Sequence, residues 1–174
     1  APVSNCRNPK PHPRMRSERA DMRPYEMTPR AIYAESFATV RREARLDRFG
    51  LGMQDVAIRL IHACGMVEVA DRLAFSDDAY EAGCASLLSG KPVLCDCEMV
   101  AAGIIRRHLP MANKVIVTLN DASVPELACE LQNTRSAAAV ELWVPHLEGA
   151  VVAIGNAPTA LYHLLGLLDR GEPA

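Results

Sequence analysis

The sequence is poor in aromatic residues, which make up 5% of its 174 residues, whereas 49% are hydrophobic. A chain of this length can bury a core, and its composition predicts one built from aliphatic side chains on packed helices and strands. A surplus of positive charge is also lacking, because 19 lysines and arginines face 21 aspartates and glutamates and the net charge is −2. We therefore expect no binding of nucleic acid.

Long apolar runs are absent as well. No run approaches the roughly 20 residues that a membrane-spanning helix needs, and no charged start precedes an apolar secretion signal. We expect a cytoplasmic protein that does not enter a membrane. Neither GxGxxG nor GxxxxGKS/T follows a predicted strand, which disfavours a nucleotide-binding α/β domain.

The six cysteines lack the CxxC spacing that is typical of a zinc site. Most of them stand inside apolar runs, and the only close pair has one residue between its members. Because free cysteine is among the most buried residue types, we expect reduced core cysteines and no metal site. The six are Cys6, Cys64, Cys84, Cys95, Cys97 and Cys129.

Residues 1–24 differ in composition from the rest of the chain. They hold five of the twelve prolines and six lysines and arginines, with almost no large apolar residue. Such a segment cannot bury enough surface to offset its ordering entropy. It is therefore predicted to be a disordered extension, either a solvated linker or a basic contact for an anionic partner, and the folded domain is predicted over residues 25–174.

From residue 25 onward, helical and strand patterns alternate. Thr28 and Pro29 predict the start of a helix, and a second helix over residues 53–64 should end at Gly65. This alternation predicts an α/β fold with three layers, a mostly parallel sheet flanked by helices. Further helices are predicted over residues 77–89, 98–109, 124–131, 134–144 and 159–169, and strands over residues 91–96, 114–121 and 149–155.

Polar residues follow each predicted strand. They are Asp96, then Asn120 and Asp121, then Gly155 and Asn156. In open parallel sheets the ligand crevice lies outside the carboxyl ends of the strands, so these residues should meet at one edge. The segment GNAPTAL also begins a helix there, whose N–H groups suit a carboxylate or phosphate. A capped helix start without a ligand is an equally open interpretation.

His62 lies on the predicted helix over residues 53–64, one turn after Arg59. At about 100° per residue, it falls opposite an apolar stripe that we interpret as the core face. It is then either an ordinary surface histidine or part of a pocket wall, and the flanking Ile58 and Ile61 favour the pocket. There it could donate and accept a proton near neutral pH. The stripe consists of Met53, Val56, Ala57, Leu60 and Cys64.

Five segments, in this order, carry a resemblance to a known family. They are AIYAESF, RLIHACG, VLCDCEMVAAGI, NTRSAAA and VVAIGNAPTAL. With them the sequence resembles the precorrin-8X methylmutase family of cobalamin biosynthesis over about residues 25–173. The resemblance implies a homodimeric α/β enzyme without a cofactor. Its reaction would be an intramolecular methyl migration from carbon eleven to carbon twelve of a tetrapyrrole macrocycle, which yields hydrogenobyrinate.

The resemblance also implies roles for particular residues. It places the family's catalytic histidine at His62, and its substrate-contacting arginine and serine at Arg59 and Ser36. We expect His62 to protonate the macrocycle. For Ser36 there is an alternative to substrate contact, since its hydroxyl can bond back to its own helix. The carboxylates that edge the ring need cationic or N–H donors, which Arg59, Arg135 and the turn at residues 156–159 can supply. The other predicted substrate-binding residues are Tyr33, Thr134, Asn156 and Thr159.

Several alternatives stay open. Arg135 can equally be a structural bridge. The sequence ends at LLDRGEPA, whereas family members continue with a strand and a segment of the type PVGFVxAxESK, so we expect a fragment of a longer enzyme or, less readily, a truncated homologue with little turnover. A non-catalytic tetrapyrrole carrier is a further alternative. So is action on the cobalt-containing substrate of the anaerobic branch, but CGMVEVA and NTRSAAAVELW favour the metal-free branch.

Overall fold

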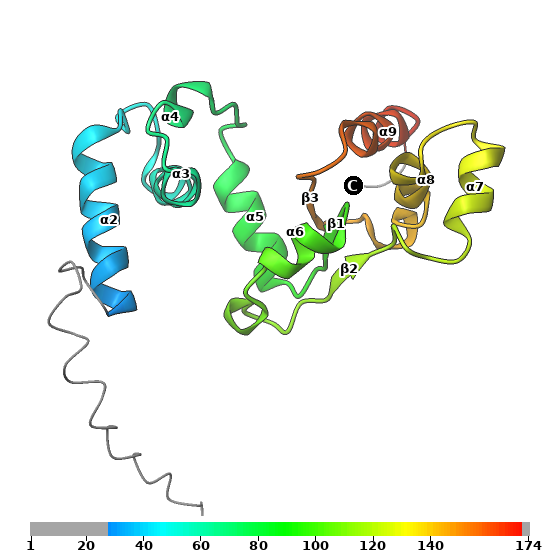
Figure 1. The fold of residues 1–174 in the computed structure, drawn as a ribbon, viewed down its shortest axis with the longest axis horizontal. Helices are drawn as coiled ribbons and strands as arrows, with labels where there is room; N and C mark the ends of the chain where they lie inside the picture. Colours follow the sequence, from blue (N-terminus) through cyan, green and yellow to red (C-terminus); the bar gives the residue numbers. More distant parts are fainter. Residues whose placement is uncertain (1–27, 172–174) are drawn as a thin grey trace, which may run out of the picture. The chain divides into compact units, whose positions relative to one another are not determined.

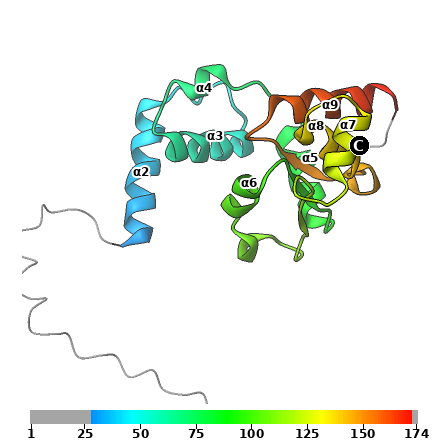
Figure 2. The same cartoon turned by 45° about the vertical axis from the view of Figure 1, so that its right-hand side comes forward.

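The computed structural model describes residues 28–171, so the extension predicted over residues 1–24 lies outside the described part. The described residues fall into two compact units that divide after Leu73, and Figures 1 and 2 show the elements of each unit. Each unit is described by itself. The prediction of one domain over residues 25–174 stays a prediction.

The first unit consists of three helices, α2 (Pro29–Glu43), α3 (Leu51–Cys64) and α4 (Val69–Arg72). Thr28 has extended backbone angles and Pro29 occupies the first helical turn, which confirms the predicted start of α2. Gly65 ends α3 with a φ of 71°, in the left-handed region that glycine adopts most easily. Helix α4 was not predicted, because its four residues are too few to show a period.

The buried face of α3 differs from the predicted one. Its buried residues are Ala57, Ile58 and Ile61, whereas Leu60 is 42% exposed and Cys64 is exposed too. The predicted core stripe is therefore confirmed for Ala57 and wrong for Leu60 and Cys64, while Met53 and Val56 are half-buried. The helix carries apolar residues around most of its circumference, so their period does not single out one face, and the packing of α2 decides which side is buried.

The second unit, residues 74–171, alternates helices with short strands that form a parallel sheet in the order β2-β1-β3. This arrangement confirms the predicted α/β class. Its helices are α5 (Ala79–Leu88), α6 (Glu98–Gly103), α7 (Val124–Glu130), α8 (Arg135–Glu141) and α9 (Pro158–Asp169), its strands are β1 (Val93–Cys95), β2 (Val115–Val117) and β3 (Val151–Ala153), and its 3-10 helices are η2 (Arg106–His108) and η3 (Val144–His146).

Helices cover both faces of this sheet, as predicted. Leu94, Ile116 and Val152 stand in register on neighbouring strands and pack with residues of α8 and α9, including Val140 and Leu164. Residues on either side of these three in each strand point to the opposite face, because side chains alternate along a strand. There they pack with residues of α5 and α6. The unit thus has three layers.

Two predicted helices are shorter than expected. The helix predicted over residues 98–109 ends at Gly103, and η2 follows, because glycine is a poor helix former. The helix predicted up to residue 144 ends at Glu141, and η3 follows. Pro145 has no N–H for an α-helical bond and restricts the residue before it, which explains this second end.

The five cysteines within residues 28–171 are free thiols but do not all lie in the core; Cys6 lies outside the described residues. Cys95 and Cys97 are buried, as predicted, whereas Cys64 and Cys129 are exposed and Cys84 is half-buried. For these last three the predicted core position is wrong. Burial, and next the neighbouring Asp96 carboxylate, raise the pKa of the Cys95 thiol. That thiol therefore stays protonated at neutral pH and is a poor nucleophile.

Candidate active site

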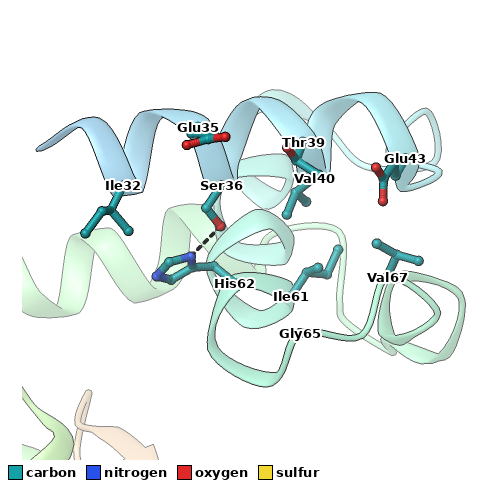
Figure 3. A pocket seen from close by; sticks show the side chains of 10 residues that line it. All are labelled: Ile32, Glu35, Ser36, Thr39, Val40, Glu43, Ile61, His62, Gly65 and Val67. Atoms are coloured by element: carbon teal, nitrogen blue, oxygen red, sulfur yellow. Dashed lines mark hydrogen bonds between the residues drawn. The ribbon is translucent and has the colours of Figure 1, made fainter. Parts of the chain in front are cut away.

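The crossing of α2 and α3 brings a serine and a histidine together. Ser36 Oγ lies 2.7 Å from His62 Nδ1, and the pair is partly buried (Figure 3). The other ring nitrogen points away from Ser36. A serine hydroxyl can both donate and accept a hydrogen bond, so this contact fits the neutral ring and the imidazolium alike. It fixes the ring while leaving Nε2 available for a ligand.

Two aromatic rings of α2 complete the surroundings of His62. The ring centroids of Tyr33 and His62 are 4.9 Å apart with an interplanar angle of 37°. The Phe37 ring meets His62 edge to face, at 5.4 Å and 85°, and also meets Tyr33 at 5.8 Å. Tyr33, Ser36 and Phe37 share one face of α2, because residues three and four apart are neighbours on a helix. The imidazole is therefore held by three side chains of a single helix.

Arg59 joins this cluster through Phe37. Its Cζ lies 5.6 Å from the centroid of the Phe37 ring, within the range of a cation–π contact. The predicted residues Tyr33, Ser36, Arg59 and His62 are thus brought together in one unit. Phe37 is the residue that the sequence prediction missed. The sequence signal that could have found it is its place four residues after Tyr33, on the same face of the helix.

A hollow of about 580 Å³ opens beside the pair, within the usual range for small-molecule sites. Ser36 and His62 line it together with apolar residues such as Ile61 and with two glutamates, Glu35 and Glu43 (Figure 3). Among the described residues that line it, none is an arginine or a lysine. The expected rim of cationic donors is therefore not found among these residues, and the cation of the cluster, Arg59, contacts the Phe37 ring without lining the hollow.

At the carboxyl edge of the sheet, Asp96 organises the turn before α9. This aspartate is 3% exposed and accepts backbone N–H bonds from Gly155 at 3.3 Å, Asn156 at 2.8 Å and Ala157 at 2.9 Å. The prediction that this turn offers its N–H groups to substrate carboxylates is therefore wrong for Asn156 and Ala157, since both N–H groups are already bonded to Asp96. The side chain of Asn156 stays a predicted substrate contact.

The pKa of Asp96 reflects this arrangement. Desolvation by burial raises it, but the bonds from the N–H groups of Ala157, Asn156 and Gly155 and from the Cys97 thiol together outweigh that effect, so the pKa is lowered. The carboxylate is thus ionised at neutral pH and acts as an internal anion at a helix start. The N–H groups before α9 were predicted to suit a carboxylate or phosphate, and the carboxylate that they bind is the side chain of Asp96.

The other predicted residues of this unit lie at the starts of α8 and α9. The hydroxyl of Thr134 donates to Thr159 Oγ1 at 2.9 Å and accepts from the N–H of Ala137 at 3.2 Å, so it caps α8. Arg135 donates to the carbonyl oxygen of Leu119 at 3.2 Å. This bond favours the structural interpretation of Arg135. Substrate binding by Thr134, Arg135 and Thr159 stays a prediction.

Metal ligands are not clustered in the described part of the chain. Among residues 28–171, no group of three or more histidine, cysteine, aspartate or glutamate side chains is placed to hold a metal ion. No helix within these residues combines the length and the apolar character needed to cross a membrane.

Comparison with known proteins decides the family. A sequence profile of the precorrin-8X methylmutase family matches residues 31–174. The precorrin-8X methylmutase of Pseudomonas aeruginosa is 58% identical over 143 residues, which cover 82% of this chain and 69% of that protein. That of a Sinorhizobium species is 53% identical over 143 residues, covering 82% and 68%. The chain belongs to the precorrin-8X methylmutase family.

Members of the precorrin-8X methylmutase family are isomerases of cobalamin biosynthesis, and this chain is accordingly an isomerase. The cobalt-precorrin-8 methylmutase of Priestia megaterium is more distant, at 30% identity over 155 residues, covering 88% of this chain and 69% of that protein. A solved precorrin-8X methylmutase of Thermus thermophilus superposes with a TM-score of 0.73 at 36% identity, covering 83% and 71%. A solved precorrin-8X methylmutase related protein gives 0.71 at 34%, covering 78% and 70%. Both confirm the predicted fold.

Proposed function

We propose that the chain isomerises precorrin-8X by moving a methyl group from carbon eleven to carbon twelve of the macrocycle, which gives hydrogenobyrinate. His62 is the proton donor and acceptor of this reaction. The observation that carries the proposal is the 2.7 Å contact between Ser36 Oγ and His62 Nδ1 beside an open hollow. The contact anchors Nδ1, while Nε2 points away from Ser36 and can meet the substrate.

The reaction follows from the two states of the imidazole. In the imidazolium, Nδ1–H donates to Ser36 Oγ and Nε2–H protonates a ring nitrogen or an adjacent carbon of the macrocycle. The added proton draws electron density away from the carbon skeleton, so the bond from the methyl group to carbon eleven breaks as the bond to carbon twelve forms. His62 then takes a proton back, and no atom is gained or lost overall. General acid help of this kind is worth about 10²–10⁴-fold in rate.

The identities favour the metal-free substrate. The two relatives named precorrin-8X methylmutases are 58% and 53% identical to the chain, whereas the cobalt-precorrin-8 methylmutase of Priestia megaterium is 30% identical. Since sites diverge with overall sequence, the closer pair supports precorrin-8X over its cobalt complex.

Further roles complete the proposal. Arg59 binds a carboxylate at the edge of the ring, because its guanidinium can donate a bidentate pair. Thr134, Arg135, Asn156 and Thr159 contact other polar edges of the substrate. Both units act as one methylmutase domain, and the chain works without a cofactor, in the cytoplasm, as a homodimer.

A spectral titration tests the proposal. Purified protein is mixed with precorrin-8X, with its cobalt complex and with hydrogenobyrinate, and the visible spectrum is followed over time. Conversion of precorrin-8X to the spectrum of hydrogenobyrinate supports the enzyme. A spectrum that shifts on binding but never converts selects a carrier or an inactive homologue, and conversion of the cobalt complex alone selects the anaerobic branch.

A further inference from the structure

The Phe37 ring contacts both the imidazole of His62 and the guanidinium of Arg59. Its centroid lies 5.4 Å from that of His62 and 5.6 Å from Cζ of Arg59. The ring face is electron-rich and attracts a cation. A single ring thus restrains the guanidinium and the imidazole at the same time.

Arg59 and His62 need such a restraint. They stand three residues apart on α3, so their side chains emerge from the same face of that helix. A guanidinium that moved freely toward the ring would disfavour the imidazolium by like-charge repulsion. It would also leave the position from which a substrate carboxylate is bound.

We propose that Phe37 is a positioning residue that holds Arg59 and His62 in their working arrangement. This inference rests on the proposed function of His62. Phe37 itself exchanges no proton and binds no carboxylate. Its loss should lower kcat by misplacing His62 and raise KM by releasing Arg59.

The test compares two phenylalanines of the first unit. Phe37→Leu removes the shared ring, and Phe49→Leu is the matched control. The control also loses an arginine contact, since Cζ of Arg48 lies 5.2 Å from the Phe49 ring. Phe49 is 4% exposed and does not line the hollow beside His62. The control should therefore lower stability but leave kcat unchanged.

We expect Phe37→Leu to lower kcat about 10-fold and to raise KM several-fold, because a misplacement of catalytic groups by about 1 Å can cost up to about 100-fold in rate. Phe37→Trp, which restores an aromatic face, should recover most of the activity. Phe37→Met, a flexible side chain of similar volume, replaces the leucine variant if that one does not fold. Wild-type kcat and KM in the folded non-aromatic variant, or an equal loss in Phe49→Leu, overturns the proposal.

A double-mutant cycle separates this inference from the proposed function. In a His62→Ala background, Phe37→Leu should lower kcat no further, because the group that it positions is gone. An undiminished effect in that background overturns the role of Phe37. Wild-type turnover in His62→Ala alone instead overturns the proposed function.

Discussion

The hydroxyl of Ser36 lies 2.7 Å from Nδ1 of His62, although the two residues are 26 positions apart in the sequence. One belongs to α2 and the other to the last turn of α3. The contact therefore exists only when the two helices are packed, and it couples the folding of the first unit to the orientation of its histidine.

Replacing the serine tests this coupling. Ser36→Ala removes the partner of Nδ1, and loss of one hydrogen bond of about 0.5–1.5 kcal/mol predicts a roughly 2- to 10-fold fall in kcat. Ser36→Thr keeps the hydroxyl and should retain most of the activity. Single-turnover absorbance measurements give kcat, and titration with the product pigment gives affinity. An alanine variant with wild-type kcat would show that the bond does not serve catalysis.

Two glutamates, Glu35 and Glu43, line the hollow and should weaken the binding of an anionic substrate. The proposed substrate carries several carboxylates, so Glu43→Gln and Glu35→Gln should each tighten its binding a few-fold by removing like charge. The gain should fade in high salt, where exposed charges are screened. Titration of the pigment at two salt concentrations measures it. Glu81→Gln, at an exposed position of α5 in the other unit, is the control and should change nothing. Weaker binding in the two test variants would contradict the expected repulsion.

Replacing Asp96 should destabilise the second unit. Asp96→Asn keeps the size of the side chain but removes the charge that three backbone N–H groups share. Hydrogen bonds to charged groups contribute about 1.5–3 kcal/mol, so we expect a loss of about 2 kcal/mol in the free energy of unfolding. Urea denaturation at pH 7 measures this. Asp121→Asn replaces an exposed carboxylate that accepts hydrogen bonds from the N–H and the hydroxyl of Ser123. It should cost clearly less, and equal costs would contradict the special role of Asp96.

The contribution of Asp96 to the free energy of unfolding should depend on pH. The pKa of its carboxylate is lowered in the folded chain, so the folded state favours the ionised form more than the unfolded state does. The stabilisation is fully present above the unfolded-state pKa of about 3.9 and is lost as the pH falls through the lower folded-state pKa. The difference in unfolding free energy between wild type and Asp96→Asn should therefore shrink in acid. A difference that stays constant from pH 7 to pH 3 would contradict this.

Much of the fold follows from local signals in the sequence. The helix start at Pro29, the helix end at Gly65 and the order of strands and helices after residue 74 were predicted, because proline, glycine and short apolar runs act locally. The buried face of α3 was predicted correctly for Ala57 but wrongly for Leu60 and Cys64. Ile58 and Ile61 are as apolar as Leu60, and only the packing of α2 distinguishes them.

Individual residues of the site were predicted from the sequence, but the contacts between them were not. The resemblance located His62, Arg59 and Ser36, yet the role of Phe37 depends on distances between two helices that no sequence period expresses. Asp96 and Asn156 were expected at one sheet edge. That the aspartate takes the N–H groups of the turn depends on the register of β1 and β3, which the sequence does not give.

The central claim is that His62 transfers the proton, and one variant tests it most directly. His62→Asn keeps an amide that can bond to Ser36 but has no group that exchanges a proton. The measurement is the single-turnover rate at which bound precorrin-8X acquires the spectrum of hydrogenobyrinate, with His108→Ala, an exposed histidine of the other unit, as the control. We expect the rate of His62→Asn to fall about 100-fold or more with unchanged pigment binding, and the rate of His108→Ala to equal that of the wild type. A near-wild-type rate in His62→Asn would contradict the central claim.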